Sequence, residues 1–247
     1  MKNYYKITVL FLGLLFFSAC HEITTEGVSS VTYYVTFELE GGERYLLPVG
    51  TPFVEPGAKA FENGKDVSSK MNITGAGDIN PNKKGFYDVT YSAVNVDGFK
   101  SSVTRTVIVY DPTIDTDISG TYVIDPDLSN RNGTTYTARA ASMGGSFGGH
   151  TISIEMVVPG IFSVNDFFGG FYAPGSGPNY KPARYYMMSG YMSLNSDDTL
   201  ELCSSGVIAW GDSLDDLKNT SYDSATETIK WSASWRGYSF NVVLNKK

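Results

Sequence analysis

The sequence predicts an all-β protein of two domains, a β-sandwich followed by an antiparallel β-barrel or a second sandwich. Short runs in which apolar and polar residues alternate recur along the chain, as expected for strands with one buried face. Glycine-containing turn signals separate these runs, and the two groups of strands show no helical periodicity. An acidic, proline-bearing segment interrupts the pattern near the middle of the chain and divides the strands into two groups.

Residues 1–19 have the features of an export signal. Lys2 and Lys6 precede an uncharged run, residues 7–17, which is too short to span a bilayer and has the length of a signal-peptide core. The run leads into the sequence FFSAC, which resembles the lipobox of bacterial lipoproteins, with phenylalanine where leucine is usual. The resemblance implies lipidation of Cys20, with palmitate among the acyl chains, and a tether over residues 20–27. An ordinary secretory signal followed by an unrelated cysteine is the alternative.

The rest of the chain predicts an acidic, water-soluble body that the lipid alone attaches to the membrane. No later segment approaches the length of a membrane span. Without residues 1–19 the chain keeps 17 of its 19 basic residues and all 26 acidic residues, a formal charge of −9. Because nucleic-acid binding requires basic patches, this balance argues against a nucleic-acid partner.

Residues 28–111 are predicted to form the first domain. Alternating apolar residues mark strands in residues 33–40, 87–93 and 103–109. Turn signals, among them Asn63-Gly64 and Asp97-Gly98, separate such runs. Several short strands in about 85 residues predict a β-sandwich.

A family resemblance makes this domain more specific. The sequences VGTPFVEPGAKAFENGKDVSS and KKGFYDVTYSAVNVDGFKSSVTRTVIVYD resemble the bacterial Ig-like domains found near the anchor of surface lipoproteins. Lys84 stands where that family usually has a proline before Gly85. The resemblance implies an Ig-like sandwich that serves as a spacer.

Residues 112–118 are predicted as a linker and residues 119–247 as a C-terminal β domain. The linker is acidic and has no apolar periodicity, which predicts that it buries no apolar face. Alternation over residues 152–156 marks one strand beyond it, and a second alternating run, residues 228–235, leads through a tight turn into residues 240–244. About eight candidate strands in 129 residues are enough to close a small antiparallel barrel or to form a second sandwich.

The C-terminal domain also carries a resemblance. The sequences ISGTY, PGIFSVNDFFGGFYA, SGVIAWGDSL and NTSYDSATETIKWSAS resemble a C-terminal β domain of uncharacterised lipoproteins. These are Gram-negative surface proteins that often accompany polysaccharide-utilisation systems. The resemblance implies no established activity.

The residue types that carry most catalysis are scarce. His21 adjoins the lipidation site, so His150 is the one histidine of the folded body, and Cys203 fits a small apolar residue on a strand. One histidine and one cysteine cannot supply a zinc site. Most carboxylates lie in turn sequences such as NSDDT and GDSLDD, with calcium ligation or catalysis as the alternatives. We therefore expect neither enzymatic activity nor a bound metal or cofactor.

The candidate ligand site lies in residues 163–192, where aromatic residues alternate with glycine and proline. Residues 169–180 contain too many chain breakers for a regular strand, so their rings either plug a barrel end or face a ligand. Aromatic faces stack on the C–H surfaces of sugars, while amides and carboxylates bind the hydroxyl groups. A glycan site of this kind would use Asp166, Tyr172, Asn179, Tyr180, Tyr185 and Trp210.

These observations predict a non-catalytic lipoprotein of the outer membrane, exposed at the cell surface. Its expected role is that of an accessory protein that binds a polysaccharide or oligosaccharide. The alternative is a structural or adhesion component whose aromatic residues contact other proteins of the envelope.

Overall fold

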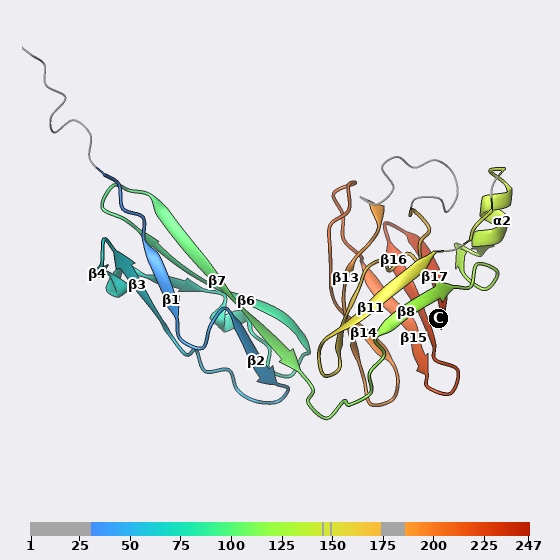
Figure 1. The fold of residues 1–247 in the computed structure, drawn as a ribbon, viewed down its shortest axis with the longest axis horizontal. Helices are drawn as coiled ribbons and strands as arrows, with labels where there is room; N and C mark the ends of the chain where they lie inside the picture. The colour runs from blue at the N-terminus through green and yellow to red at the C-terminus, as the bar shows by residue number, and fades with distance from the viewer. Residues whose placement is uncertain (1–30, 145, 149, 174–185) are drawn as a thin grey trace, which may run out of the picture.

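A computed structural model describes residues 31–144, 146–148, 150–173 and 186–247 of this chain. Figure 1 shows two β domains side by side, with the chain passing from one to the other after β7 (Lys100–Tyr110). In the described part, no helix is both long enough and apolar enough to cross a membrane. The predicted all-β fold class is confirmed.

The N-terminal domain is the predicted Ig-like β-sandwich. One sheet has three strands in the order β1 (Thr36–Leu39), β3 (Ala58–Glu62) and β4 (Lys65–Asp66). The other has four in the order β2 (Arg44–Pro48), β7, β6 (Gly85–Val94) and β5 (Asn72–Thr74). Two 3-10 turns, η1 (Ser68–Lys70) and η2 (Ala76–Asp78), flank β5. Strands β2 and β7 run parallel, and the other pairs run antiparallel.

A buried ion pair fixes the interior of this sandwich. Arg105 of β7 is completely buried and pairs with Glu55. Its guanidinium also donates to the carbonyl oxygens of Gly42 and Gly57, at 3.0 and 3.1 Å. Because the partners lie far apart in sequence, this fully bonded arginine ties loops of the sandwich to its central strand.

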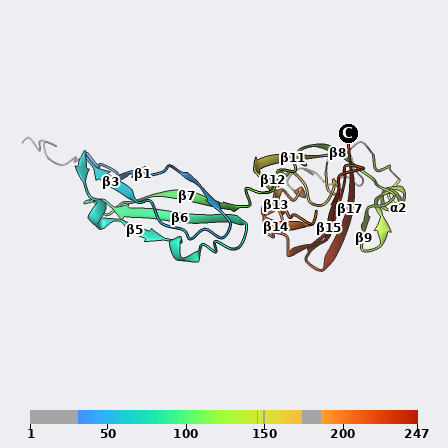
Figure 2. The same ribbon diagram turned by 90° about the horizontal axis from the view of Figure 1, so that it is seen from below.

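The C-terminal domain is a single curled, ten-stranded sheet, a half-barrel (Figures 1 and 2). Along the main path the strands are β10 (Thr134–Thr135), β9 (Asn130–Arg131), β17 (Tyr238–Lys246), β8 (Gly120–Ile124), β11 (Thr151–Val158), β12 (Ile161–Val164), β13 (Gly190–Leu194) and β14 (Leu200–Ser205). Off this path, β16 (Thr228–Trp235) pairs with β17 and with β15 (Asp216–Asp223).

Strand β15 curls back towards β14 without forming a backbone ladder with it. The Thr220 hydroxyl donates to the Leu200 carbonyl and accepts the Leu200 N–H, both at 2.8 Å. The sheet therefore curves as a barrel does. At the seam between β14 and β15, the Thr220 side chain makes the hydrogen bonds that strand pairing would otherwise make.

Aromatic side chains dominate the core of the half-barrel. The turn after β12 sends Phe167 and Phe168 into it, and both are completely buried. The Trp231 indole N–H donates to the Phe167 carbonyl at 2.8 Å, and the Tyr136 hydroxyl donates to the Phe168 carbonyl at 2.7 Å. Tyr136 begins the short helix α2 (Tyr136–Ala141). The aromatic run that follows residue 163 is thus core at least as far as residue 173.

The segment predicted as a linker does bury apolar side chains, which corrects the sequence interpretation. Ile114 and Ile118 both belong to the core of the half-barrel. Two isoleucines four residues apart are too sparse for a periodicity signal, yet each fills a core position. The chain that joins the domains is therefore anchored in the second one.

The two domains also touch directly. Ile108 of β7 packs with Val158 and Ile161 of the half-barrel, and Phe86 lies against this cluster. The Lys84 ammonium donates to the Leu194 carbonyl at 3.0 Å. The Ig-like domain therefore rests against the half-barrel beside β12 and β13.

Candidate functional site

Asp166 is the most deeply buried of the three predicted ligand-binding residues that the structure describes. It is completely buried, and its carboxylate accepts the backbone N–H groups of Phe168, Gly170 and Met188 at 3.0, 2.8 and 2.9 Å. Burial raises the pKa of this carboxyl group to about 6, against the three N–H bonds, which lower it. The carboxylate holds two chain segments together, so the predicted contact with a ligand is wrong for this residue.

Tyr172 and Trp210 come together, but mainly as parts of the protein's own aromatic packing. Tyr172 is 3% exposed and meets Trp210 edge-on, with 5.1 Å between the ring centroids. Tyr186 stacks on Trp210 at 4.2 Å, and Trp235 lies at 5.4 Å with a 31° angle between the planes. Because Tyr172 is buried, it cannot form the predicted ligand platform, whereas Trp210 remains 38% exposed at the end of the half-barrel.

The other predicted functional residues lie outside the described residues. They are Cys20, Asn179, Tyr180 and Tyr185. Their roles as lipidation site and ligand contacts stay predictions.

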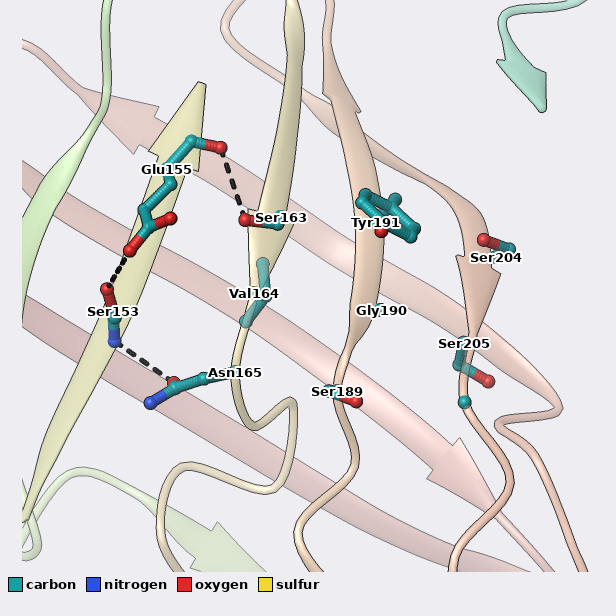
Figure 3. Close-up of a pocket in the computed structure, with 11 residues that line it drawn as sticks. Ser153, Glu155, Ser163, Val164, Asn165, Ser189, Gly190, Tyr191, Ser204 and Ser205 are labelled. Atoms are coloured by element: carbon teal, nitrogen blue, oxygen red, sulfur yellow. Dashed lines mark hydrogen bonds between the residues drawn. The ribbon is translucent and has the colours of Figure 1, made fainter. Parts of the chain in front are cut away.

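A polar groove of about 400 Å³ lies on the outer face of the half-barrel (Figure 3). It crosses four neighbouring strands, β11 to β14, which at about 4.8 Å per strand gives a surface about 14 Å wide. Alternation along each strand turns apolar side chains inward and short polar ones outward. The outward residues used below are Ser153, Glu155, Asn165, Ser189, Tyr191 and Ser204.

Hydrogen bonds within the groove orient some polar groups and leave others directed outward. The Asn165 side-chain oxygen accepts the Ser153 N–H at 3.0 Å (Figure 3), and no hydrogen bond within the described part of the chain uses the amide NH₂ of Asn165. The Ser153 hydroxyl donates to Glu155 at 3.3 Å. In the described part of the chain, the hydroxyl groups of Ser189 and Ser204 make no hydrogen bond to protein. The groove therefore offers donors and acceptors close together.

Gly190 allows β13 and β14 to approach closely at the base of the groove. The pairing of β13 with β14 shifts register between Tyr191 and Met192, as at a β-bulge. At Gly190, an added Cβ would lie 2.3 Å from the Ser204 carbonyl oxygen and 2.7 Å from the Ser205 Cα. Only glycine fits at this crossing, so the strands approach closely and leave a depression beside Tyr191.

Tyr191 forms the wall of the groove nearest the Ig-like domain. Its ring lies 4.4 Å from that of Phe86, with an angle of 41° between the planes. The side chain nevertheless remains 37% exposed. A half-exposed ring that is braced from one side can pack against an apolar ligand face and keep its hydroxyl in water.

Sequence reasoning missed this groove. The signal was present, because serine, glutamate and asparagine occupy every second position of two strands, in SIEM and SVN. The groove forms only when four strands align in register, and register comes from pairings between segments that are separated in the sequence.

Burial shifts the pKa values of His150 and Cys203, the two residues considered for catalysis. The His150 Nε2 atom is buried and has no hydrogen-bond partner among the described residues, and burial lowers the pKa of the imidazole. Burial raises the pKa of the Cys203 thiol to about 11, which disfavours the reactive thiolate. Within the described residues, no three histidine, cysteine or carboxylate side chains cluster as metal ligands.

Comparisons with known proteins agree with the two-domain architecture. A family model described as a bacterial surface protein Ig-like domain matches residues 37–109. A second model, described as a C-terminal domain, matches residues 111–246, more than half of the chain. No curated protein matches the chain.

One solved structure is similar to most of the chain, and a second matches about half of it. The lipoprotein BT2262 from Bacteroides thetaiotaomicron is 37% identical, over 86% of this chain and 100% of that one, with a TM-score of 0.43. The CBM51-2 and INT domains of Clostridium perfringens ZmpB, solved in complex with GlcNAc, are 18% identical over 53% of this chain and 28% of theirs, with a TM-score of 0.27. The second similarity is too low to support any statement about this chain.

Proposed function

We propose that this chain, which belongs to the same family as the Bacteroides thetaiotaomicron lipoprotein BT2262, is itself a lipoprotein of the outer membrane. We further propose that its half-barrel binds glycan at the cell surface, for the reasons given below. Acylation of Cys20, with palmitate among the chains, would hold the protein in the membrane. The Ig-like domain would then act as the spacer between the lipid and the half-barrel.

The observation that carries the proposal is the chemistry of the groove on β11 to β14. Sugars present many hydroxyl groups on one side of a ring and C–H groups on its faces. The Asn165 amide and the Ser204 hydroxyl can bond the hydroxyl groups, and the Tyr191 ring can cover a C–H face. The width of about 14 Å suits a short oligosaccharide better than a single small ligand.

A role in binding rather than catalysis is consistent with the same residues. The groove holds one carboxylate, Glu155, whereas glycoside hydrolysis generally requires two that face each other across the sugar. We therefore propose a non-catalytic accessory protein.

A glycan array probed with the protein lacking residues 1–20 tests this function. Asn165→Asp keeps the oxygen that accepts the Ser153 N–H but removes both donors, and Ser204→Ala removes one hydroxyl group. Each variant should weaken glycan binding by roughly 2-fold to 10-fold, because each loses one or two hydrogen bonds. Asn80→Asp is the matched control, because Asn80 is exposed on the Ig-like domain and its side-chain oxygen likewise accepts a backbone N–H, that of Asn82, at 3.0 Å.

Two outcomes would contradict the proposal. One is the absence of any bound glycan on the array, and the other is equal binding by the groove variants and the control. Loss of a co-purifying envelope protein in the Tyr191→Ala variant, together with a negative array, would favour the structural or adhesion role instead.

A further inference from the structure

A second depression, separate from the groove, lies at the other end of the strand order. It has a volume of about 250 Å³ and is lined by Arg131, Asn132, Thr134, Arg139, Phe171 and Tyr238. These residues come from β9, β10 and the turn between them, helix α2, the turn after β12, and β17. Strands β9 and β10 end the sheet opposite to β13 and β14, so the two depressions share no residue. We call this second depression the arginine pocket.

Aromatic rings hold one of its two arginines in place. The guanidinium carbon of Arg131 lies 3.9 Å from the centroid of the Tyr238 ring and 5.3 Å from that of Phe171. Its backbone is fixed because Arg131 pairs with Phe240 of β17. A planar guanidinium that packs on ring faces keeps its N–H groups directed outward from its edge, which is the arrangement that binds a planar or tetrahedral anion.

The neighbouring turn supplies further polar groups at fixed positions. Asn132 has a left-handed backbone, with φ of 50°, and its side-chain oxygen accepts the Ser239 N–H at 2.8 Å. That bond anchors the turn to β17 and leaves the amide NH₂ of Asn132 available to a ligand. The Thr134 hydroxyl lines the same pocket.

Neither arginine of the pocket has a counter-ion within the described part of the chain. The ion pairs found there involve Arg105, Lys218, Arg236 and Lys246. Arg131 and Arg139 are both half-buried, in a protein whose formal net charge is −7. Arg105 shows the contrast, because it is buried and fully bonded. Two half-buried, unpaired cations on one pocket favour an external anion.

We propose that the arginine pocket binds the carboxylate or sulfate group of an acidic glycan, a proposal that rests on the glycan-binding function for the source of that anion. Arg131 forms a bidentate contact with the anion, and Arg139 closes the second side of the pocket. Asn132 and Thr134 bond the adjacent sugar hydroxyl groups. The pocket thereby selects acidic over neutral glycans, while the groove on β11 to β14 accepts the neighbouring part of a chain or a separate one.

The test is calorimetric titration of the protein lacking residues 1–20 with matched probes. Oligogalacturonate is compared with its methyl ester, a sulfated galactan oligosaccharide with its desulfated form, and inorganic sulfate serves as the free anion. An acidic oligosaccharide should bind roughly tenfold or more tightly than its neutral counterpart, as expected for charge-assisted hydrogen bonds. Added salt should weaken this binding.

The variants assign the effect to the pocket. Arg139→Gln and Arg131→Gln should each weaken binding of the acidic probe by roughly tenfold. Arg131→Lys keeps the charge and the long side chain but loses the bidentate geometry, so it should also bind less tightly. Arg236→Gln is the matched control, because Arg236 lies on the adjacent turn, is largely exposed and is paired with Asp212. A thermal melt of each variant checks that it folds.

The outcomes separate this site from the proposed function. Equal affinity for acidic and neutral probes, or equal binding by Arg139→Gln and Arg236→Gln, would overturn the arginine pocket while leaving the groove untouched. Binding of inorganic sulfate without any oligosaccharide would overturn the assignment to a glycan. Binding of the acidic probe that persists in Asn165→Asp and Ser204→Ala but is lost in Arg139→Gln would support the arginine pocket, even if the groove on β11 to β14 proves not to bind glycan.

Discussion

Replacing Asp166 with asparagine should destabilise the half-barrel, although it only exchanges one carboxylate oxygen for an NH₂ group. The Oδ1 atom of Asp166 accepts two backbone N–H groups, from Phe168 and Met188, and Oδ2 accepts that of Gly170. Asparagine keeps the first oxygen but turns an NH₂ group towards the Gly170 N–H, so a donor faces a donor in a buried site. The expected loss in free energy of unfolding at pH 7.5 is about 1–3 kcal/mol, the cost of a buried polar group deprived of its partner.

Urea denaturation followed by tryptophan fluorescence measures this loss, because Trp231 is bonded to the same turn through the Phe167 carbonyl. Asp197→Asn is the matched control. Asp197 is exposed, and a single oxygen accepts both the Thr199 N–H and the Thr199 hydroxyl, so its replacement should change stability by no more than about 0.5 kcal/mol. If Asp166→Asn unfolds at the same urea concentration as Asp197→Asn, Asp166 does not hold the turn and the structural role argued for it is wrong.

Two further predictions concern pH and the membrane anchor. Because burial raises the pKa of Asp166 to about 6, from the ordinary 3.8, the folded state binds this proton more tightly than the unfolded chain. The stability that this proton contributes to the folded state is complete below about pH 4 and is lost as the pH rises through 6. The difference in free energy of unfolding between the wild type and Asp166→Asn should therefore shrink by up to about 3 kcal/mol as the pH rises over that range. A difference that does not vary with pH would contradict the raised pKa. Replacing Cys20 with alanine should move the protein from the membrane to the soluble fraction and abolish palmitate labelling, and a wild type that carries no label would refute lipidation.

The strands could be predicted because their signal is local. A strand with one buried face alternates over a few residues, and the runs in residues 87–93 and 103–109 became β6 and β7. The same reasoning gave the hairpin of β16 and β17, whose turn has Arg236 and Gly237 both at positive φ. Closure of the second domain was less predictable, because it depends on Thr220 bridging to Leu200 across the seam.

The ligand-site prediction was wrong for Asp166 and Tyr172, where glycine and proline gave a misleading signal. The glycines and prolines of residues 169–180 left two interpretations open, rings that plug a barrel end and rings that face a ligand. In the structure, Gly169 and Gly170 adopt positive φ, and a Cβ at Gly169 would lie 2.8 Å from the Ile124 side chain. These glycines allow the chain to turn tightly inside the core and carry Phe168 and Tyr172 inward. Glycines that usually indicate an exposed loop therefore lie in a buried turn here.

The arginine pocket could not be predicted from the sequence, because its residues lie in short elements that are far apart along the chain. Arg131 and Arg139 lie in a two-residue strand and a six-residue helix, elements too short for periodicity to reveal. Their aromatic neighbours, Phe171 and Tyr238, are distant in sequence from them and from each other. Only the folded sheet brings the four side chains together.

The Ig-like domain supports the half-barrel through direct contacts. Its Phe86 braces Tyr191, the aromatic wall of the groove, and its Lys84 binds the backbone at the end of β13. Phe86 also covers the apolar residues Val158 and Ile161, which would face water in an isolated half-barrel. Removing the first domain would therefore expose apolar surface and release the Tyr191 ring at the same time. For the glycan binding proposed above, this loss of support predicts weaker binding by the isolated half-barrel, even though none of the polar residues of the groove would have changed.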